Sequence, residues 1–225
     1  MVTERVPAIE LRARIHAALG DPHRLAIVES LRDRDAAPVE LARELDLPSN
    51  LLAHHLNLLE DAGLIDRTPS YGDARRRYVR LRPEPLDGLV AIEPLPARSV
   101  LFVCTRHSAR SQLAAALWGR HSPVPAASAG TQPAPAVHAM AVSAAAERGL
   151  DLSHATPRSI GEVPAEPDLV VSVCDRAHET AVAGRWRLHW STADPVAAGR
   201  RAAFLRTIDE LEPRIVRLAA RVAAA

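Results

Sequence analysis

The chain has 225 residues, of which 48% are apolar, and a formal net charge of +1, so it can form one large domain or two modest ones. No stretch approaches the roughly 20 consecutive apolar residues of a membrane span, and the first residues lack the pattern of a secretory signal. We therefore expect a cytoplasmic protein without a membrane partner. Its two cysteines are too few for a disulfide scaffold and wrongly spaced for a zinc finger.

The first part of the sequence predicts short helices. Apolar residues recur at helical spacing over 9–19, and Asp21 followed by Pro22 is typical of a helix start. A short helix over 38–45 is expected to turn four apolar side chains inward. These are Val39, Leu41, Ala42 and Leu45.

A longer helix and a hairpin follow. Ser49 is the expected cap of the helix, and Gly63 is the expected glycine just beyond its end. Residues 64–67 and 77–81, joined through a turn at 72–73, predict a β-hairpin.

This arrangement predicts a winged helix-turn-helix that binds double-stranded DNA. The span 67–82 holds six arginines and a single acidic residue. The expected contacts to bases come from Ser49, Asn50 and His54, and those to phosphates or the minor groove come from Arg75, Arg76 and Arg77. Residues 1–82 contain 13 arginines and 13 acids, which leaves open a winged helix used only for dimerisation or protein contact.

No metal site is predicted. His54 and His55 are adjacent on a helix and point in different directions, so they are poor joint ligands. One is expected to face DNA or solvent and the other to pack.

Prolines mark a boundary in the chain. Pro83, Pro85, Pro94 and Pro96 punctuate a segment that we interpret as a linker over 83–98, with at most one short helix around 86–92. The sequence thus predicts a mainly α winged-helix domain over 1–82 and a second domain over 99–225.

The second domain has the pattern of an α/β fold. Residues 99–103 and 168–173 are apolar runs of strand length, and helices are expected over 111–120, 140–149 and 205–221. Buried strands that alternate with helices favour a parallel sheet. The alanine- and proline-rich stretch 123–136 is expected to be a loop.

The segment 104–111 carries the strongest chemical signal. It runs Cys-Thr-Arg-His-Ser-Ala-Arg-Ser between a predicted strand and a predicted helix. A tight loop that ends at a helix N-terminus aims its N–H groups at one point, which suits a tetrahedral oxyanion. Such dipoles and Arg110 are expected to lower the pKa of the Cys104 thiol, and Ser111 can donate a hydrogen bond to its sulfur. The predicted oxyanion-binding residues are Thr105, Arg106, His107, Ser108, Ala109, Arg110 and Ser111.

The N-terminal part resembles the arsenic-repressor (ArsR/SmtB) family over about residues 9–82. The likeness lies in 18–27, 40–42 and 52–65, with His-His-Leu and Ala-Gly-Leu as its most specific segments. The resemblance implies a homodimer on a two-fold operator, with the helix over 9–19 as a candidate dimer surface. The cysteine pair that many members carry near 39–41 is missing, and Leu51 and Ala53 stand where polar side chains would be expected.

The C-terminal part resembles the low-molecular-weight tyrosine phosphatase fold and the arsenate reductases built on it. The segment 104–111 is followed in order by 128–131, 149–154 and Asp194-Pro195. The resemblance implies that Asp194 is the general acid. His107 departs from the family, which usually has asparagine there; as a ring donor it could brace the loop, or as a cation it could lower the Cys104 pKa further.

Two features favour arsenate over an aryl phosphate. Residues 196–198 are Val-Ala-Ala, where the phosphatases have tyrosines, and Cys174 resembles the second redox cysteine of thioredoxin-coupled reductases. His189-Trp190 is also similar to the reductases. The stretch 175–180 offers no third cysteine, so Cys174 either forms a disulfide with Cys104 or only packs while a small-molecule thiol resolves the intermediate.

The sequence thus predicts a transcriptional regulator fused to a thiol-dependent arsenate reductase. Cys104, Arg110, Asp194 and Cys174 are the candidate catalytic residues, arsenate or phosphate is the ligand, and no cofactor is tightly bound. The reductant is thioredoxin or a small-molecule thiol. Two alternatives remain: a repressor whose C-terminal domain binds an oxyanion without turnover, and a low-molecular-weight protein phosphatase.

Overall fold

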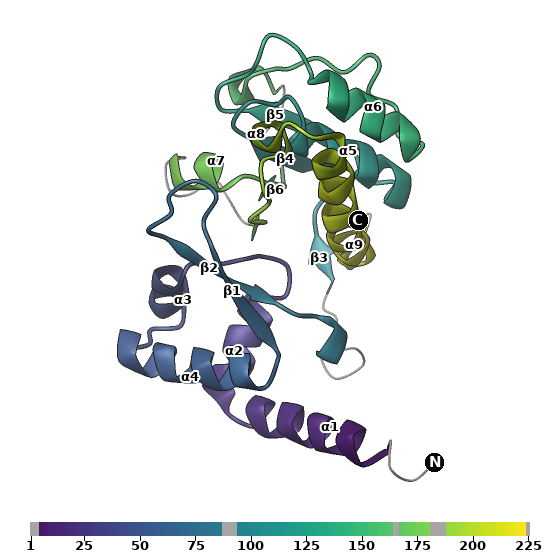
Figure 1. Ribbon diagram of the computed structural model, residues 1–225. Helices are drawn as coiled ribbons and strands as arrows, with labels where there is room; N and C mark the ends of the chain where they lie inside the picture. The colour runs from purple at the N-terminus through teal and green to yellow at the C-terminus, as the bar shows by residue number, and fades with distance from the viewer. Residues whose placement is uncertain (1–4, 87–93, 164–166, 181–187, 224–225) are drawn as a thin grey trace. The chain divides into compact units, whose positions relative to one another are not determined.

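The computed structural model describes residues 5–86, 94–163, 167–180 and 188–223. The chain forms two compact units (Figure 1). The N-terminal unit comprises Met1–Ser70 and Ala74–Ala91, and the C-terminal unit comprises Tyr71–Asp73 and Ile92–Ala225. Among the described residues, no helix has the length and apolar character needed to cross a membrane.

The N-terminal unit has the predicted helices and hairpin. Its elements are α1 (Arg5–Leu19), α2 (Pro22–Ser30), α3 (Pro38–Glu44), α4 (Ser49–Asp61), β1 (Ile65–Pro69), β2 (Arg77–Leu81) and the 3-10 turn η1 (Glu84–Leu86). The helices α3 and α4 form the helix-turn-helix, and β1 and β2 pair antiparallel as the wing.

The helix ends confirm two of three expectations. The Asp21 carboxylate caps α2 by accepting hydrogen bonds from the backbone N–H groups of His23 and Arg24, at 2.9 and 3.1 Å. Gly63 follows the last turn of α4 with φ +73°, a left-handed conformation that favours glycine. Ser49 is wrong as a cap: it is the first helical residue, and the cap position belongs to Pro48, which has no side-chain oxygen.

The prediction that Val39 of α3 faces the core is also wrong. Leu41 is fully buried, but Val39 is 63% exposed. Two residues apart on a helix lie about 200° apart around its axis, so both cannot face one core. Ala42 and Leu45 pack at the edge of that core.

The wing is fastened to the helical core through its second strand. Val79 forms an isolated antiparallel bridge with Ala36 in the α2–α3 connection. Beside it, Arg80 lies 3.2 Å from the carboxylate of Asp35, which is only 3% exposed. The hairpin and the helix-turn-helix therefore share one packed base.

The C-terminal unit is an α/β fold with a parallel sheet, as predicted. The sheet has the order β5-β4-β6-β7, with every neighbouring pair parallel. Its strands are β4 (Val100–Cys104), β5 (Ala126–Gly130), β6 (Leu169–Ser172) and β7 (Leu188–His189). The helical elements are α5 (Arg110–His121), α6 (Ala139–Glu147), α7 (Asp175–Thr180), α8 (Pro195–Ala198), α9 (Arg201–Arg221) and the 3-10 turn η2 (Ile160–Glu162).

The loop predicted over 123–136 is wrong in its first half. β5 lies there and pairs with β4 from Val100–Ala126 through Cys104–Gly130. Alanine, serine and glycine give this strand no apolar alternation, so only its pairing at the sheet edge defines it.

The proline-rich segment also has structure. Leu95–Pro96 forms the short strand β3, which pairs in parallel with β8 (Val222–Ala223). Most of the helix expected around 86–92 lies outside the described residues.

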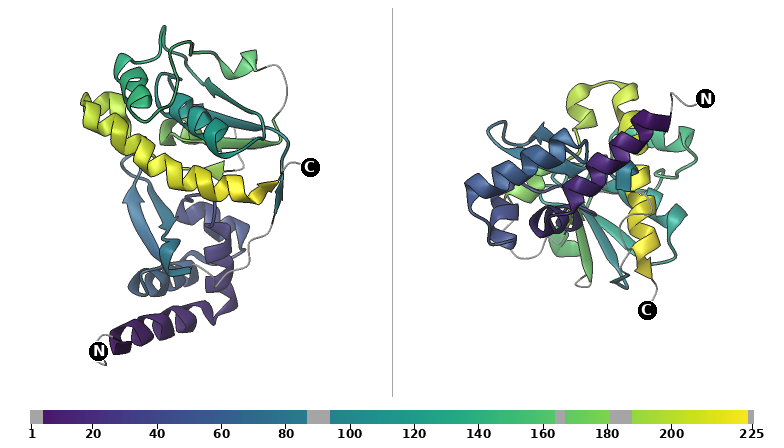
Figure 2. Two further views of the ribbon diagram at one scale, coloured as in Figure 1. Left: turned by 90° about the vertical axis from the view of Figure 1, so that its right-hand side faces the viewer. Right: turned by 90° about the horizontal axis from the view of Figure 1, so that it is seen from below.

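The sheet is covered on both faces. Phe102 and Cys104 point into the larger core, where α5 and α9 lie side by side (Figure 2). Leu101 and Val103 point to the opposite face and pack near Ile160 of η2. Because both faces are buried, β4 is a continuous apolar run rather than an alternating one.

The strand order places a crevice at the end of β4. The chain goes from β4 to β5 on one side and then to β6 on the other. Such a switch point opens a crevice at the carboxyl ends of parallel strands, where ligands bind. Cys104 is the last residue of β4, so it lies at this switch point.

Candidate active site

The loop between β4 and α5 encloses the sulfur of Cys104. The His107 backbone N–H donates to this sulfur at 3.2 Å, and the Ser111 hydroxyl lies 3.1 Å from it on the first turn of α5. Cys104 is 2% exposed. The loop and the helix start thus surround one reactive atom, as the sequence predicted.

A cavity of about 210 Å³ opens in front of the sulfur. Its lining includes four of the predicted oxyanion-binding residues together with both Cys104 and Asp194; the full set is Cys104, Arg106, Ser108, Ala109, Arg110, Ala134, Ala136, His138, Asp194 and Val196. The other three predicted loop residues, Thr105, His107 and Ser111, are buried behind it. They brace the cavity rather than line it.

Arg110 is held in place by two acceptors. Its Nη1 donates to the carbonyl of Thr192 at 2.9 Å, and its Nη2 lies 3.2 Å from Oδ2 of Asp194. The other oxygen of Asp194 accepts the backbone N–H of Val196 and so caps α8. A guanidinium and a carboxylate therefore meet at the wall of the cavity, with Asp194 still 40% exposed along its side chain.

The thiol of Cys104 differs from the expectation. Burial raises its pKa, and this outweighs the lowering by Arg110 and by the Ser111 hydrogen bond. The two groups act in the predicted direction, but desolvation of the thiolate is the larger effect. In the ligand-free site the pKa of the Cys104 thiol therefore lies above its ordinary value.

His107 braces the loop in its neutral form. Its φ of +50° is left-handed, a conformation that histidine and asparagine adopt more readily than most residues. Its Nδ1 accepts the backbone N–H of Arg158 at 2.8 Å, so Nε2 carries the proton and donates to Ser128 at 2.8 Å. Burial and the nearby Arg158 lower the pKa of His107 to about 4. The alternative of a cationic His107 is thus wrong, and the alternative of a ring donor is correct.

Several bracing residues carried no sequence signal. Gln112 donates to the carbonyls of His107 and Thr156, and the Arg158 side chain donates to the carbonyl of Ser128. The bond from Gln112 to His107 spans five residues, whereas the other two join residues 44 and 30 positions apart. No local spacing could have found these two long-range contacts.

Gly130 leaves room for the loop. A Cβ at this position would lie 2.8 Å from the Thr105 carbonyl oxygen and 2.9 Å from Cβ of His107. Close approach of two backbone segments is a specific reason for glycine here.

Cys174 lies next to the loop, just beyond β6. Its sulfur is 3.2 Å from the Thr105 hydroxyl, and it is 2% exposed. The neighbouring Asp175 is buried and bonds His189 at 3.1 Å and the Ser191 hydroxyl at 3.0 Å. Both cysteines are free thiols.

The predicted DNA-binding residues lie on α4 and on the wing of the N-terminal unit, and Ser49 and Arg77 line one shared pocket. Ser49, Asn50 and His54 are exposed on α4, whereas Arg75, Arg76 and Arg77 are exposed where the wing turns. The other three arginines of the basic span pair with acids: Arg67 with Glu60, Arg80 with Asp35 and Arg82 with Asp66. The three acids offset part of the positive charge that the arginine count over 67–82 suggested.

Comparisons with known proteins identify both units. The model of the low molecular weight phosphotyrosine protein phosphatase family matches residues 99–225, and a helix-turn-helix domain model matches residues 19–68. An arsenate reductase from Brevibacillus brevis is 35% identical over 130 residues, which cover 54% of this chain and 94% of that protein.

Two further relatives agree with this division. An HTH-type transcriptional regulator of Methanocaldococcus jannaschii, MJ1325, is 39% identical over 57 residues; these cover 25% of this chain and 64% of that protein, slightly less than two thirds of its length. A solved structure of an arsenate reductase in its oxidised state superposes with a TM-score of 0.50 at 25% identity, covering 56% of this chain and 99% of that one.

We predict that Gly130→Ala destabilises the C-terminal unit by about 1–3 kcal/mol, because the added methyl group collides with the loop. Gly119→Ala is the matched control: no atom lies within 4 Å of the Cβ position in α5, and alanine favours a helix, so a gain of about 0.5–1 kcal/mol is expected. Urea denaturation measures the free energy of unfolding of both variants against the wild type. Equal effects of the two substitutions would contradict this account of the loop.

We predict that His107 makes the free energy of unfolding decrease as the solution becomes more acidic. Its pKa is about 4 when folded against an ordinary value of 6.5, so between these values the unfolded chain binds more protons. Stability should fall as the pH drops from 6.5 to about 4, by at most about 1.4 kcal/mol per pH unit from this group. Denaturation of the wild type and His107→Asn across this range tests it; His107→Asn should have the shallower slope, and parallel slopes would refute the assignment.

Proposed function

The chain belongs to the low molecular weight phosphotyrosine protein phosphatase family, and from this premise we propose that its C-terminal unit reduces arsenate with Cys104 as nucleophile. The observation that carries the proposal is the sulfur at the base of a cavity whose wall holds Arg110 and Asp194. The N-terminal unit is a helix-turn-helix domain, so a regulator module and this fold are joined in one chain.

In the first proposed step Cys104 attacks arsenate. The loop N–H groups and Arg110 hold the oxyanion, and the sulfur forms a bond to arsenic while one oxygen departs. Cys104–SH and HAsO₄²⁻ become Cys104–S–AsO₃²⁻ and water, so the thiol proton leaves with the oxygen. Asp194 receives that proton and passes it to the departing oxygen.

In the second step another thiol attacks the Cys104 sulfur. The sulfur–arsenic bond breaks, its electron pair stays on arsenic, and HAsO₃²⁻ leaves as arsenic(III) while a disulfide forms. We propose Cys174 as this thiol, because its sulfur contacts Thr105, the residue next to Cys104. Thioredoxin or a small-molecule thiol then reduces the disulfide, and no tightly bound cofactor takes part.

The cavity wall supports arsenate over an aryl phosphate. Beyond Asp194 its lining offers Val196, Ala134 and Ala136, and the lining residues include no tyrosine, phenylalanine or tryptophan. The one ring in the lining is the His138 imidazole, which is stacked on Phe204. A low-molecular-weight protein phosphatase is the second candidate, and membership of the phosphatase family favours it.

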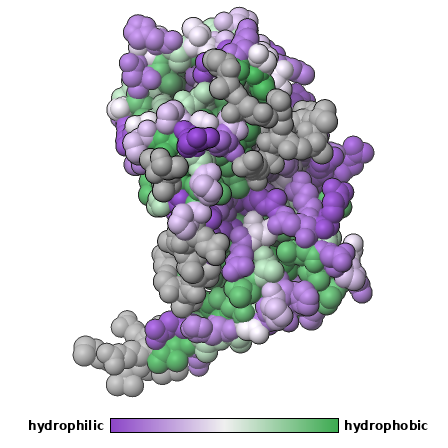
Figure 3. All heavy atoms as spheres, turned by 180° about the vertical axis from the view of Figure 1, so that it is seen from behind, coloured by the Kyte–Doolittle hydropathy of each residue, from purple (hydrophilic) through white to green (hydrophobic). Residues whose placement is uncertain are grey.

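For the N-terminal unit we propose DNA binding as a homodimer. Apolar side chains reach the surface of this unit (Figure 3), and on α1 Ile9 is 54% and Leu11 is 44% exposed. These residues supply a candidate dimer surface, as the ArsR/SmtB resemblance implies.

The test of the enzyme is arsenate-dependent oxidation of a thiol reductant, with arsenite measured as product. The wild type is expected to release arsenite, and Cys104→Ser is expected to lower the rate by at least about 10³-fold. Aryl phosphate hydrolysis is measured beside it. Arsenate binding without arsenite release would support the silent oxyanion sensor, and phosphate hydrolysis alone would support the phosphatase.

Cys174→Ser is measured in the same assay. If Cys174 resolves the adduct, the substitution abolishes turnover with thioredoxin and leaves the first step intact, so a single equivalent of arsenate is trapped on Cys104. Turnover with a small thiol at the wild-type rate would instead assign Cys174 to packing.

The wing arginines are tested by the salt dependence of binding to duplex DNA. Replacing Arg75 and Arg76 with alanine should weaken binding to every duplex and lower the slope against log salt by about 0.9 for each phosphate that is no longer neutralised. Arg206→Ala, on the exposed side of α9, is the control and should leave the slope unchanged. An unchanged slope in the wing variant would assign the hairpin to protein contact.

A further inference from the structure

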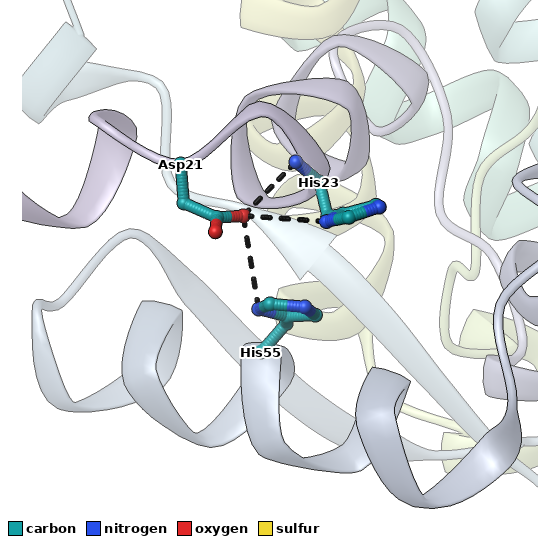
Figure 4. A group of neighbouring side chains, drawn as sticks. All are labelled: Asp21, His23 and His55. Carbon is teal, nitrogen blue, oxygen red and sulfur yellow. Dashed lines mark hydrogen bonds and ion pairs between the residues drawn. The ribbon is translucent and has the colours of Figure 1, made fainter.

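Three potential metal ligands meet in the N-terminal unit. Asp21 caps α2, His23 lies in the first turn of the same helix, and His55 lies on α4 (Figure 4). Their ligand atoms all lie within 4.8 Å of one another. Nδ1 of His23 is 3.8 Å and Nδ1 of His55 is 3.9 Å from the same carboxylate oxygen of Asp21.

The buried member of this cluster is His55. It is 5% exposed, and within the described residues neither of its ring nitrogens has a hydrogen-bond partner. Burying a polar group without a hydrogen-bond partner is destabilising, so a native imidazole in this state calls for an explanation.

The other two ligands are accessible. His23 is half exposed along its side chain, and Asp21 is 30% exposed. The two imidazole rings stack with their centroids 5.4 Å apart, and both approach the same oxygen of the Asp21 carboxylate (Figure 4). An ion can therefore enter from solvent past His23 and reach the buried ring.

Arg24 is the nearest competing cation, and its main contacts lie elsewhere. Its guanidinium donates to the carbonyls of Ala17 and Ala18 at the end of α1, and it approaches the second oxygen of Asp21 at 3.9 Å. The first oxygen, which lies between the two histidines, accepts the backbone N–H groups of His23 and Arg24. The guanidinium therefore leaves the side of the carboxylate that faces the two rings open to an ion.

We propose that Asp21, His23 and His55 bind a divalent transition-metal ion of the zinc class. Two imidazoles and a carboxylate suit this class, and they leave a fourth position open to solvent. Tetrahedral bonds of usual length need donor atoms about 3.3 Å apart, so the two separations from the Asp21 oxygen must shrink by about half an ångström, and the donor atoms, now within 4.8 Å of one another, must all draw closer. Rotation of the half-exposed His23 side chain brings its own nitrogen closer, and a small shift of Asp21 toward His55 is needed as well.

Such a site lies apart from the oxyanion chemistry and goes beyond the proposed function. The ion would join the N-terminus of α2 to α4, the helix that carries Ser49, Asn50 and His54. It would act on the DNA-binding unit without any cysteine.

The experiment is titration of the metal-free full chain with Co²⁺ as a spectroscopic probe, followed by displacement with Zn²⁺. One equivalent is expected to give visible d–d bands of a nitrogen and oxygen ligand set, without the near-ultraviolet band of a thiolate ligand. His23→Gln should weaken binding by at least about tenfold. His54→Gln, next to His55 but exposed and outside the cluster, should change the affinity less than about twofold.

His55→Gln is the second variant, with circular dichroism as the check on folding. Should it unfold, the His23→Gln result decides alone, because that side chain is half exposed. The proposal is overturned if wild-type protein binds no Co²⁺, if a thiolate band appears and vanishes in Cys104→Ser, or if His54→Gln weakens binding as much as His23→Gln.

Discussion

The site depends on one constraint, the tight passage of the backbone from the end of β4 into α5. Within a few residues the chain must leave the sheet, circle the Cys104 sulfur and start a helix. The left-handed conformation of His107 makes the passage possible, and the missing side chain of Gly130 leaves space for it. Because His107 also bonds Ser128 and Arg158, two other segments of the unit hold the turn in place.

The same enclosure determines the chemistry. A sulfur surrounded by packed atoms is poorly solvated, so burial makes its proton harder to remove, while Arg110 acts in the opposite direction. The Arg110 guanidinium is held beside it by the Thr192 carbonyl and the Asp194 carboxylate.

Much of this could be predicted from the sequence, for local reasons. Helix starts such as Asp21-Pro22, apolar strands such as β4, and the segment 104–111 all carry their signal within a few residues. β5 escaped prediction because its small residues have no pattern of their own and only its neighbour makes it a strand. The braces of the loop escaped because they join segments 21 to 51 positions apart.

The histidine cluster illustrates the same limit. The adjacent pair His54 and His55 diverges as the sequence predicts, since His54 is exposed and His55 is buried. The partners of His55 come instead from the start of α2, more than thirty residues earlier. Only the packing of α2 against α4 brings them together.

Trp190 gives the C-terminal unit an intrinsic optical reporter. The indole is buried, its ring lies 6.1 Å from that of Phe102, and its own backbone N–H bonds the carbonyl of Ser172. Two residues later the Thr192 carbonyl receives the guanidinium of Arg110. Only two positions in the chain separate this indole from the carbonyl that holds Arg110, so a shift of the guanidinium on anion binding would change the surroundings of one of the three tryptophans in the chain.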